Sequence, residues 1–249
     1  MSEPSEQRVS LEPFFVELGR SLSAATADAL QARPNPGQLR VTVDAAMGAF
    51  EDAVAGLEKW SGPERKLDCR EGCTHCCRLT VLADGATVIR IALYIEENFG
   101  AERRSRLMQR IAERQALHAG LEQAERQLRR DPCPLLEDGR CSVYPVRPMI
   151  CRSFNSMNVA TCEREILGGG NPEGIDAWRI PWLVGLAVNE GLMTGLVEAG
   201  YVDGDVELVA GLAIALGQPN TAERWLAHEP SLAPAQWRIA PADDPEDPA

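Results

Sequence analysis

The sequence predicts a mostly α-helical protein, with helical flanks around an irregular, cysteine-rich centre. Apolar residues recur at spacings of three and four in both flanks, which is the period of one helix face. All eight cysteines lie between residues 69 and 162. The strand–helix alternation that a parallel sheet requires is not seen in the sequence, so an α/β class is disfavoured.

The N-terminal flank is predicted to be an antiparallel helical hairpin. The apolar faces of its two helices are formed by residues 14, 18, 22, 25 and 29, and by residues 43, 47, 50, 54 and 57. Between them, residues 33–37 read RPNPG. Proline lacks an amide hydrogen and restricts the residue before it, so this segment is expected to break the helix.

The next elements lead into a charged segment. Residues 79–83 are expected to form a strand or an extended loop, and Asp84 is expected to cap a helix that closes at Gly100. Residues 102–130, with eight arginines and four glutamates, are predicted to form one long helix. Because the glutamates are interleaved at helical spacing, an ion-paired, solvated face is favoured over a phosphate- or nucleic-acid-binding one.

The second half of the chain begins irregularly and ends in helices. Residues 131–162 have many turn formers and little periodicity, and GGGNP at 168–172 indicates a linker. Helices are expected over 177–199, 205–216 and 221–227, with close helix contact at the glycines Gly185, Gly191 and Gly195. The predicted regions are an N-terminal hairpin (1–66), a cysteine-rich region (67–168), a C-terminal helical region (171–240) and a disordered acidic tail (241–249).

Composition excludes several functional classes. The net charge of −12, from 25 basic and 37 acidic residues, opposes binding to nucleic acid or to an anionic membrane. The first ten residues, MSEPSEQRVS, are acidic and polar, unlike a secretory signal. No apolar run is expected to approach the roughly 18 residues that span a bilayer. A cytoplasmic protein is therefore predicted, whose protein partner, if it has one, the sequence does not identify.

Several chemistries could explain the cysteines, which are Cys69, Cys73, Cys76, Cys77, Cys133, Cys141, Cys151 and Cys162. Disulfides are disfavoured in a cytoplasmic chain that is long enough to fold without them. A thioredoxin-type dithiol belongs at a strand-to-helix junction of an α/β fold. Three cysteines at C-x3-C-x2-C match the spacing in radical S-adenosylmethionine enzymes, but helices follow them and Cys77 can fill the open coordination position.

Metal coordination by thiolates accounts for the cluster best, and all eight cysteines are predicted ligands. Soft thiolates select zinc, Cu(I) and iron–sulfur clusters. Cys76 and Cys77 are adjacent and direct their side chains differently, which favours two centres or one polynuclear cluster over a mononuclear site. Because residues 131–162 lack apolar periodicity, metal binding is expected to supply their folding free energy, on the order of 10 kcal/mol for structural zinc.

Two motifs carry a family resemblance. Residues 72–77 contain G-C-x-x-C-C, and residues 133–154 read CPLLEDGRCSVYPVRPMICRSF. Together they resemble the YkgJ-type cysteine-cluster proteins, the zinc- or iron-chelating CxxCxxCC proteins of bacteria, over roughly residues 67–165. Three residues separate Cys69 from Cys73 where the family often has two. The resemblance implies metal or iron–sulfur binding by these cysteines.

Charged residues near the cysteines are the next candidates. Arg147 and Arg152 flank Cys151 and are predicted to neutralise a thiolate site, whose net charge would be −2 with zinc or with an oxidised four-iron cluster. His75 lies between two cysteines and could ligate, although eight thiolates do not require it. His118, alone in a helical segment, is expected to be exposed.

The sequence therefore predicts a protein that binds an iron–sulfur cluster, with 4Fe–4S favoured, or zinc. Two further classes stay open. One is a cofactor-dependent protein-modifying enzyme, because some relatives are linked to protein lysine methylation. The other is a protein that delivers or senses iron or zinc. No set of acid, base and nucleophile outside the cysteines identifies a catalytic site, so no catalytic residue and no reaction is assigned.

Overall fold

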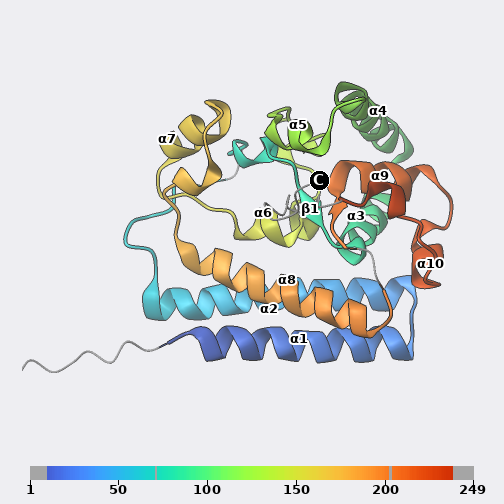
Figure 1. Cartoon of the computed structure of the whole chain (residues 1–249), viewed down its shortest axis with the longest axis horizontal. Coiled ribbons are helices and arrows are strands. Elements are labelled where there is room, and N and C mark those ends of the chain that lie inside the picture. Colours follow the sequence, from blue (N-terminus) through green and yellow to red (C-terminus); the bar gives the residue numbers. More distant parts are fainter. Residues whose placement is uncertain (1–9, 71, 202–203, 238–249) are drawn as a thin grey trace, which may run out of the picture.

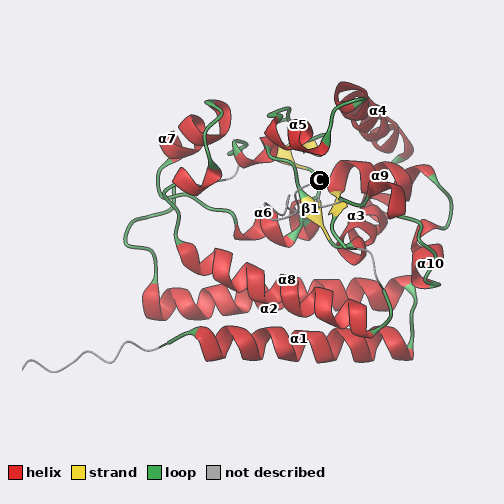
Figure 2. Ribbon diagram, in the orientation of Figure 1, coloured by secondary structure: helices red, strands yellow, loops and turns green. Residues whose placement is uncertain are grey.

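The computed structural model describes residues 10–70, 72–201 and 204–237 (Figure 1). The predicted fold class is confirmed, because most of these residues lie in helices and the strands are only two residues long (Figure 2). The predicted tail at 241–249 lies outside the described residues. Large apolar side chains from both flanks and from the centre share one core, which runs in sequence from Leu30 to Ala235.

The N-terminal hairpin is confirmed as α1 (Glu12–Ala32) and α2 (Pro36–Ser61). The side chain of Asn35 accepts a hydrogen bond from the Gln38 amide and caps α2, whose first residue is a proline. Helix α8 (Arg179–Glu198) packs against both of them, so that the three helices form one side of the molecule (Figure 1).

Glycines on α8 permit its close approach to α1, as the sequence indicates. A Cβ atom added at Gly195 would lie 2.5 Å from the carbonyl oxygen of Ser23. Backbone atoms of α1 leave no room for a side chain there. By contrast, Gly48 in the middle of α2 has no atom within 4 Å of such a Cβ.

We expect Gly195→Ala to lower the free energy of unfolding by about 1–3 kcal/mol, because overpacking forces the two helices apart. Gly48→Ala is the matched control. It should raise the free energy of unfolding by up to about 1 kcal/mol, because alanine favours the helix and nothing opposes its methyl group. Urea unfolding of both variants and the parent measures the difference. A stabilised Gly195→Ala variant would show that the α1–α8 contact is looser than described.

Helix α8 corrects one expectation about membranes. Its 20 residues have a mean hydropathy of 1.4, so that by length and composition it could cross a bilayer. The expectation that no apolar run approaches this length is therefore wrong. Half of the helix window is buried inside the protein, where it packs against α1, α2 and α6. Core helices pass the same test, and this packing is that of a core helix.

Beside this layer lie α3 (Gly85–Asn98), α9 (Leu208–Gly217) and α10 (Thr221–Leu226). Helix α3 packs against α2 and α9. Strand β1 (Leu82–Ala83) pairs antiparallel with β4 (Val206–Glu207), which fixes the segment before α3 against the start of α9.

The cap of α3 is confirmed. The carboxylate of Asp84 accepts hydrogen bonds from the amide and the hydroxyl of Thr87, each at 2.7 Å. This cap starts α3 directly after β1.

The single long charged helix predicted over residues 102–130 is wrong. The structure divides it into α4 (Ala101–His118) and α5 (Gln123–Leu128). Gly120 between them has a φ of +76°, a left-handed conformation that ends a helix. Glu122 then starts α5 through a capping box with Glu125.

The cysteine region contains short elements, which are β2 (Leu136–Glu137), β3 (Arg140–Cys141), α6 (Met149–Ser153) and α7 (Val159–Cys162). Single turns of 3-10 or π helix lie at Cys76–Arg78, Tyr144–Val146, Glu163–Leu167, Pro172–Gly174 and Ala233–Ala235. Leu135, Val143, Val146 and Met149 are buried in the main core. The expectation that residues 131–162 have only metal to hold them is therefore wrong for their first half, because these four side chains are irregularly spaced yet converge.

Candidate metal centre

The first cysteine segment is a loop followed by a 3-10 turn. Cys69 and Cys73 lie in the loop, and Cys76 and Cys77 begin the turn. The Ser156 amide donates a hydrogen bond to the sulfur of Cys69 at 3.2 Å. The Asp68 amide in turn donates to the Ser156 carbonyl oxygen at 2.9 Å. These bonds fold the chain after α6 back onto the first cysteine segment.

The second cysteine segment is a hairpin that its own sequence specifies. Asp138 and Gly139 adopt φ values of +49° and +74°, the left-handed pair that a two-residue hairpin turn requires. The turn pairs Leu136 with Cys141 across β2 and β3. The amide of Cys133 donates to the carbonyl oxygen of Cys77 at 2.8 Å, which joins the two cysteine segments directly.

Cys69, Cys73 and Cys162 form one group of neighbouring thiols. Partial burial, opposed by the Ser156 amide and aided by the nearby Cys73, Cys76 and Cys162, raises the pKa of Cys69 to about 11. Burial also raises the pKa of Cys162, which again has Cys73 and Cys76 as neighbours. Cys162 and Cys76 share a small apolar cluster with Ile166, Ile175, Leu79 and Phe154, separate from the main core.

Cys133, Cys141 and Cys151 form the other group. Burial, with a smaller contribution from the nearby Cys141, raises the pKa of Cys133 to about 11. Burial raises the pKa of Cys151 too, with added repulsion from Cys76, Cys133 and Cys141. Cys133 and Cys141 both pack against the main core. This group is therefore anchored on the part of the protein that folds around α3 and α9.

Cys76 stands between the two groups. It neighbours Cys69 and Cys162 on one side and Cys141 and Cys151 on the other. The adjacent Cys77 thiol and burial raise the pKa of Cys76. Raised thiol pKa values mean that protons have to leave when a metal ion binds.

The donor set fits a soft metal, although the sulfurs have to turn to reach it. In the described parts of the chain, no group of three or more His, Cys, Asp or Glu side chains stands in the geometry of a metal site. All eight cysteines are free thiols, and none of them is in a disulfide. Each of the eight has another cysteine near enough that the two charged thiolates would repel each other, and coordination of zinc or iron relieves that repulsion.

Comparison with protein families agrees with this donor set. Residues 68–168 match the family model CxxCxxCC, described as a putative zinc- or iron-chelating domain. This segment is similar to the CxxCxxCC domain over those residues. The match begins one residue before Cys69 and ends six residues after Cys162, so it holds every cysteine of the chain. Neither the curated proteins nor the solved structures gave a match.

The two arginines that are predicted to neutralise the thiolates, Arg147 and Arg152, lie in different surroundings. The charge of Arg147 acts on Cys76, Cys141 and Cys151, and in each case it lowers the thiol pKa that other causes raise. Its guanidinium lies over the Tyr144 ring, 4.0 Å from the centroid. Its Nε atom is buried without a hydrogen-bond partner. Arg147 therefore lies near these thiols, and its Nε–H group is a hydrogen-bond donor without a partner.

Arg152 contacts α2 and the backbone just before its own helix. Its guanidinium forms an ion pair with Glu51 at 2.5 Å, bonds to the Pro145 carbonyl oxygen and lies 3.3 Å from the Met47 sulfur. These contacts tie α6 to α2. In this structure Arg152 supports the helix that carries Cys151, and its predicted action on a metal stays a prediction.

The histidines also lie differently from one another. His75 lies 3.8 Å from the Glu163 carboxylate, at the edge of the first thiol group. His118 is partly buried, so the expectation that it is exposed is wrong. Its Nε2 atom lies 3.0 Å from Nε of Arg114 and 3.1 Å from the Asp131 carboxylate.

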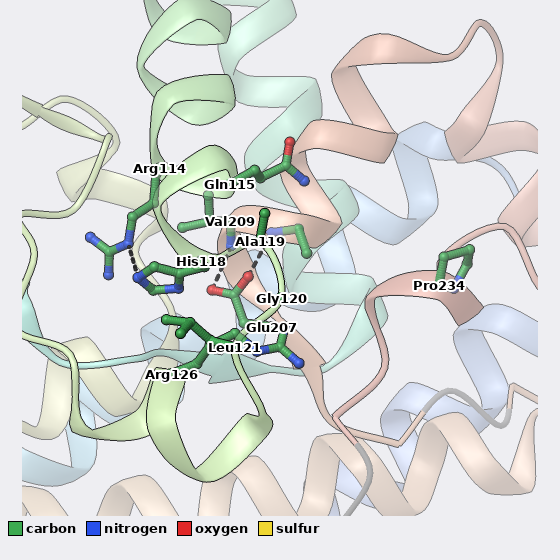
Figure 3. A pocket seen from close by; sticks show the side chains of 11 residues that line it. Arg114, Gln115, His118, Ala119, Gly120, Leu121, Arg126, Glu207, Val209 and Pro234 are labelled. Atoms are coloured by element: carbon green, nitrogen blue, oxygen red, sulfur yellow. Dashed lines mark hydrogen bonds between the residues drawn. The ribbon is translucent and has the colours of Figure 1, made fainter.

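A pocket of about 370 Å³ lies between the end of α4, α5 and the start of α9 (Figure 3). Arg114, His118, Arg126 and Glu207 are among its lining residues. The Glu207 carboxylate accepts hydrogen bonds from the amides of Val209 and Ala210, and thereby caps α9. Arg114 and Glu207 also act electrostatically on Cys133.

The sequence analysis predicts neither Ser156 nor Arg114 as a site residue. The spacing of Arg114 from Arg103 and Arg110 along one helix face is the signal that could have identified Arg114.

Proposed function

We propose that this chain holds a polynuclear metal centre through its clustered thiolates, with an iron–sulfur cluster favoured over zinc. The observation that carries the proposal is the position of Cys76, which neighbours thiols of both groups. A single zinc ion takes four ligands in a tetrahedron, whereas Cys76 neighbours five other thiols, those of Cys69, Cys77, Cys141, Cys151 and Cys162. A cluster, or two metal ions that share a thiolate, uses ligands that arrive from two sides.

The surroundings of the thiols support the same proposal. Thiolates bound to a cluster carry net negative charge, which hydrogen bonds and nearby cations tune. Arg147 supplies a cation to Cys76, Cys141 and Cys151, and the Ser156 amide already donates to Cys69. We infer that these two residues neutralise the centre from opposite sides.

Metal analysis of the full chain, purified without oxygen, tests the proposal. We expect iron and acid-labile sulfide in each chain, together with broad visible absorption. A colourless protein with stoichiometric zinc would overturn the iron–sulfur assignment and keep thiolate binding of metal. A metal-free protein in which all eight thiols react with a thiol reagent would overturn metal binding altogether. Protein purified with a strong chelator supplies the metal-free reference spectrum.

A further inference from the structure

Three arginines on α4 hold the segment that leads into the second cysteine group. Arg103, Arg110 and Arg114 lie seven and four residues apart, on one face of the helix. Arg114 donates to the carbonyl oxygens of Asp131 and Pro132, each at 2.7 Å.

The other two arginines extend these contacts along the hairpin. Arg110 donates to the carbonyl oxygen of Pro134 at 2.8 Å. Arg110 and Arg103 also bind the Glu137 carboxylate, at 2.9 and 2.8 Å. Residues 131–137 are therefore fixed to α4 by hydrogen bonds that involve no cysteine.

Arg114 is the buried member of the three, at 7% exposed. A buried arginine is costly unless its donors are satisfied. Here the guanidinium bonds to two carbonyl oxygens. It also bonds to His118, as Figure 3 shows. Arg129 lowers the pKa of Asp131 to about 2, so a carboxylate completes this network.

The position of Cys133 depends on these contacts. Asp131 and Pro132 directly precede Cys133, whose amide bonds to the Cys77 carbonyl oxygen. Arg114 thus fixes the point at which the two cysteine segments meet.

We propose that Arg114 is a positioning residue, which holds Cys133 at the junction of the two cysteine segments before metal binds. The consequence for metal affinity rests on the proposed function, whereas the ordering of the apo segment does not. The guanidinium is needed, because its Nη1 atom bonds to both carbonyl oxygens while its Nε atom bonds to His118, and lysine has only one nitrogen for these two positions.

Arg114→Gln tests the proposal against Arg106→Gln. Arg106 lies on the same helix, is exposed, and contacts Glu102 alone at 2.5 Å. Metal retention is measured as the chelator concentration that removes half of the bound metal. Hydrogen exchange of the Cys133 and Leu136 amides is measured in the apo protein. We expect about tenfold weaker retention in Arg114→Gln, as for other residues that orient metal ligands, with faster exchange of both amides. Arg106→Gln should match the parent.

A purely structural role predicts a different pattern. It would lower the unfolding temperature of Arg114→Gln. Metal retention and the hydrogen-exchange rates of the Cys133 and Leu136 amides in the folded protein would stay as in the parent. This pattern would overturn the proposal. If Arg114→Gln does not fold, Arg114→Lys decides: weaker retention by the folded lysine variant supports the proposal, and parental retention overturns it. If the parent binds no metal, the proposed function fails, and the apo exchange rates alone decide whether Arg114 positions Cys133.

Discussion

Replacing Cys76 with serine should remove most of the metal bound per chain and abolish most of the visible absorption. Cys76 neighbours Cys69 and Cys162 in one thiol group, and Cys141 and Cys151 in the other. Serine is nearly isosteric but is a poor ligand for soft metals at neutral pH. Removing the thiol between two sets of ligands therefore weakens both sets at once.

The adjacent Cys77 provides the matched control. Its thiol contacts that of Cys76, and its carbonyl oxygen, which serine retains, accepts the Cys133 amide. We expect Cys77→Ser to lose less than half of the metal. Iron, zinc and sulfide per chain, with absorption spectra, are measured for both variants and the parent after purification without oxygen. Equal losses, or a larger loss in Cys77→Ser, would contradict the central position of Cys76.

The helical flanks could be predicted because their cores are periodic. Leu39, Val43 and Phe50 lie on one face of α2 at spacings that sequence inspection detects, and all three are buried. The centre could not be predicted in this way. Its anchors follow a hairpin turn and short helical turns, so they fall at irregular spacings, and only the finished fold brings Leu135 and Val146 into the main core.

Charge patterning misled the interpretation of residues 102–130 for a related reason. Counting arginines and glutamates does not show which arginines face water and which face the protein. Arg106 pairs with Glu102 on the surface, as expected, whereas Arg114 is buried against backbone carbonyl groups. Carbonyl acceptors are present in every residue and leave no mark in the sequence. Interleaved glutamates therefore indicate a solvated face only for those arginines with which they form ion pairs.

The cysteines could be identified from the sequence, but their grouping could not. By position in the chain, Cys162 belongs with Cys151. In the structure it joins Cys69 and Cys73, because the segment around Ser156 folds back onto Asp68 and Cys69. Residue 156 makes those bonds with its backbone amide and carbonyl group, which any residue except proline could supply. Sequence spacing within one loop is therefore a poor guide to which thiols share a metal.

Metal removal should loosen only one half of the centre, and this is the second large effect that we expect. In the described part of residues 66–80, no side chain is buried. Residues 156–176 have only the small cluster around Cys162, Ile166 and Ile175. By contrast, residues 131–149 place four side chains in the main core and are held by arginines of α4. Metal binding therefore has more folding free energy to supply to the first two segments.

Limited trypsin digestion of the chelated protein, mapped by mass spectrometry, tests this expectation. After metal removal we expect much faster cleavage after Arg70 and Arg164, which lie in the loosened segments. Cleavage after Arg140, which is exposed in the hairpin, should change little, because Leu135 and Val143 on either side of it remain in the core. Arg20, exposed on α1, controls for global unfolding. If cleavage after Arg140 rises as much as cleavage after Arg70, the second cysteine segment also depends on metal for its fold, and anchoring by the core and by α4 is insufficient to hold it.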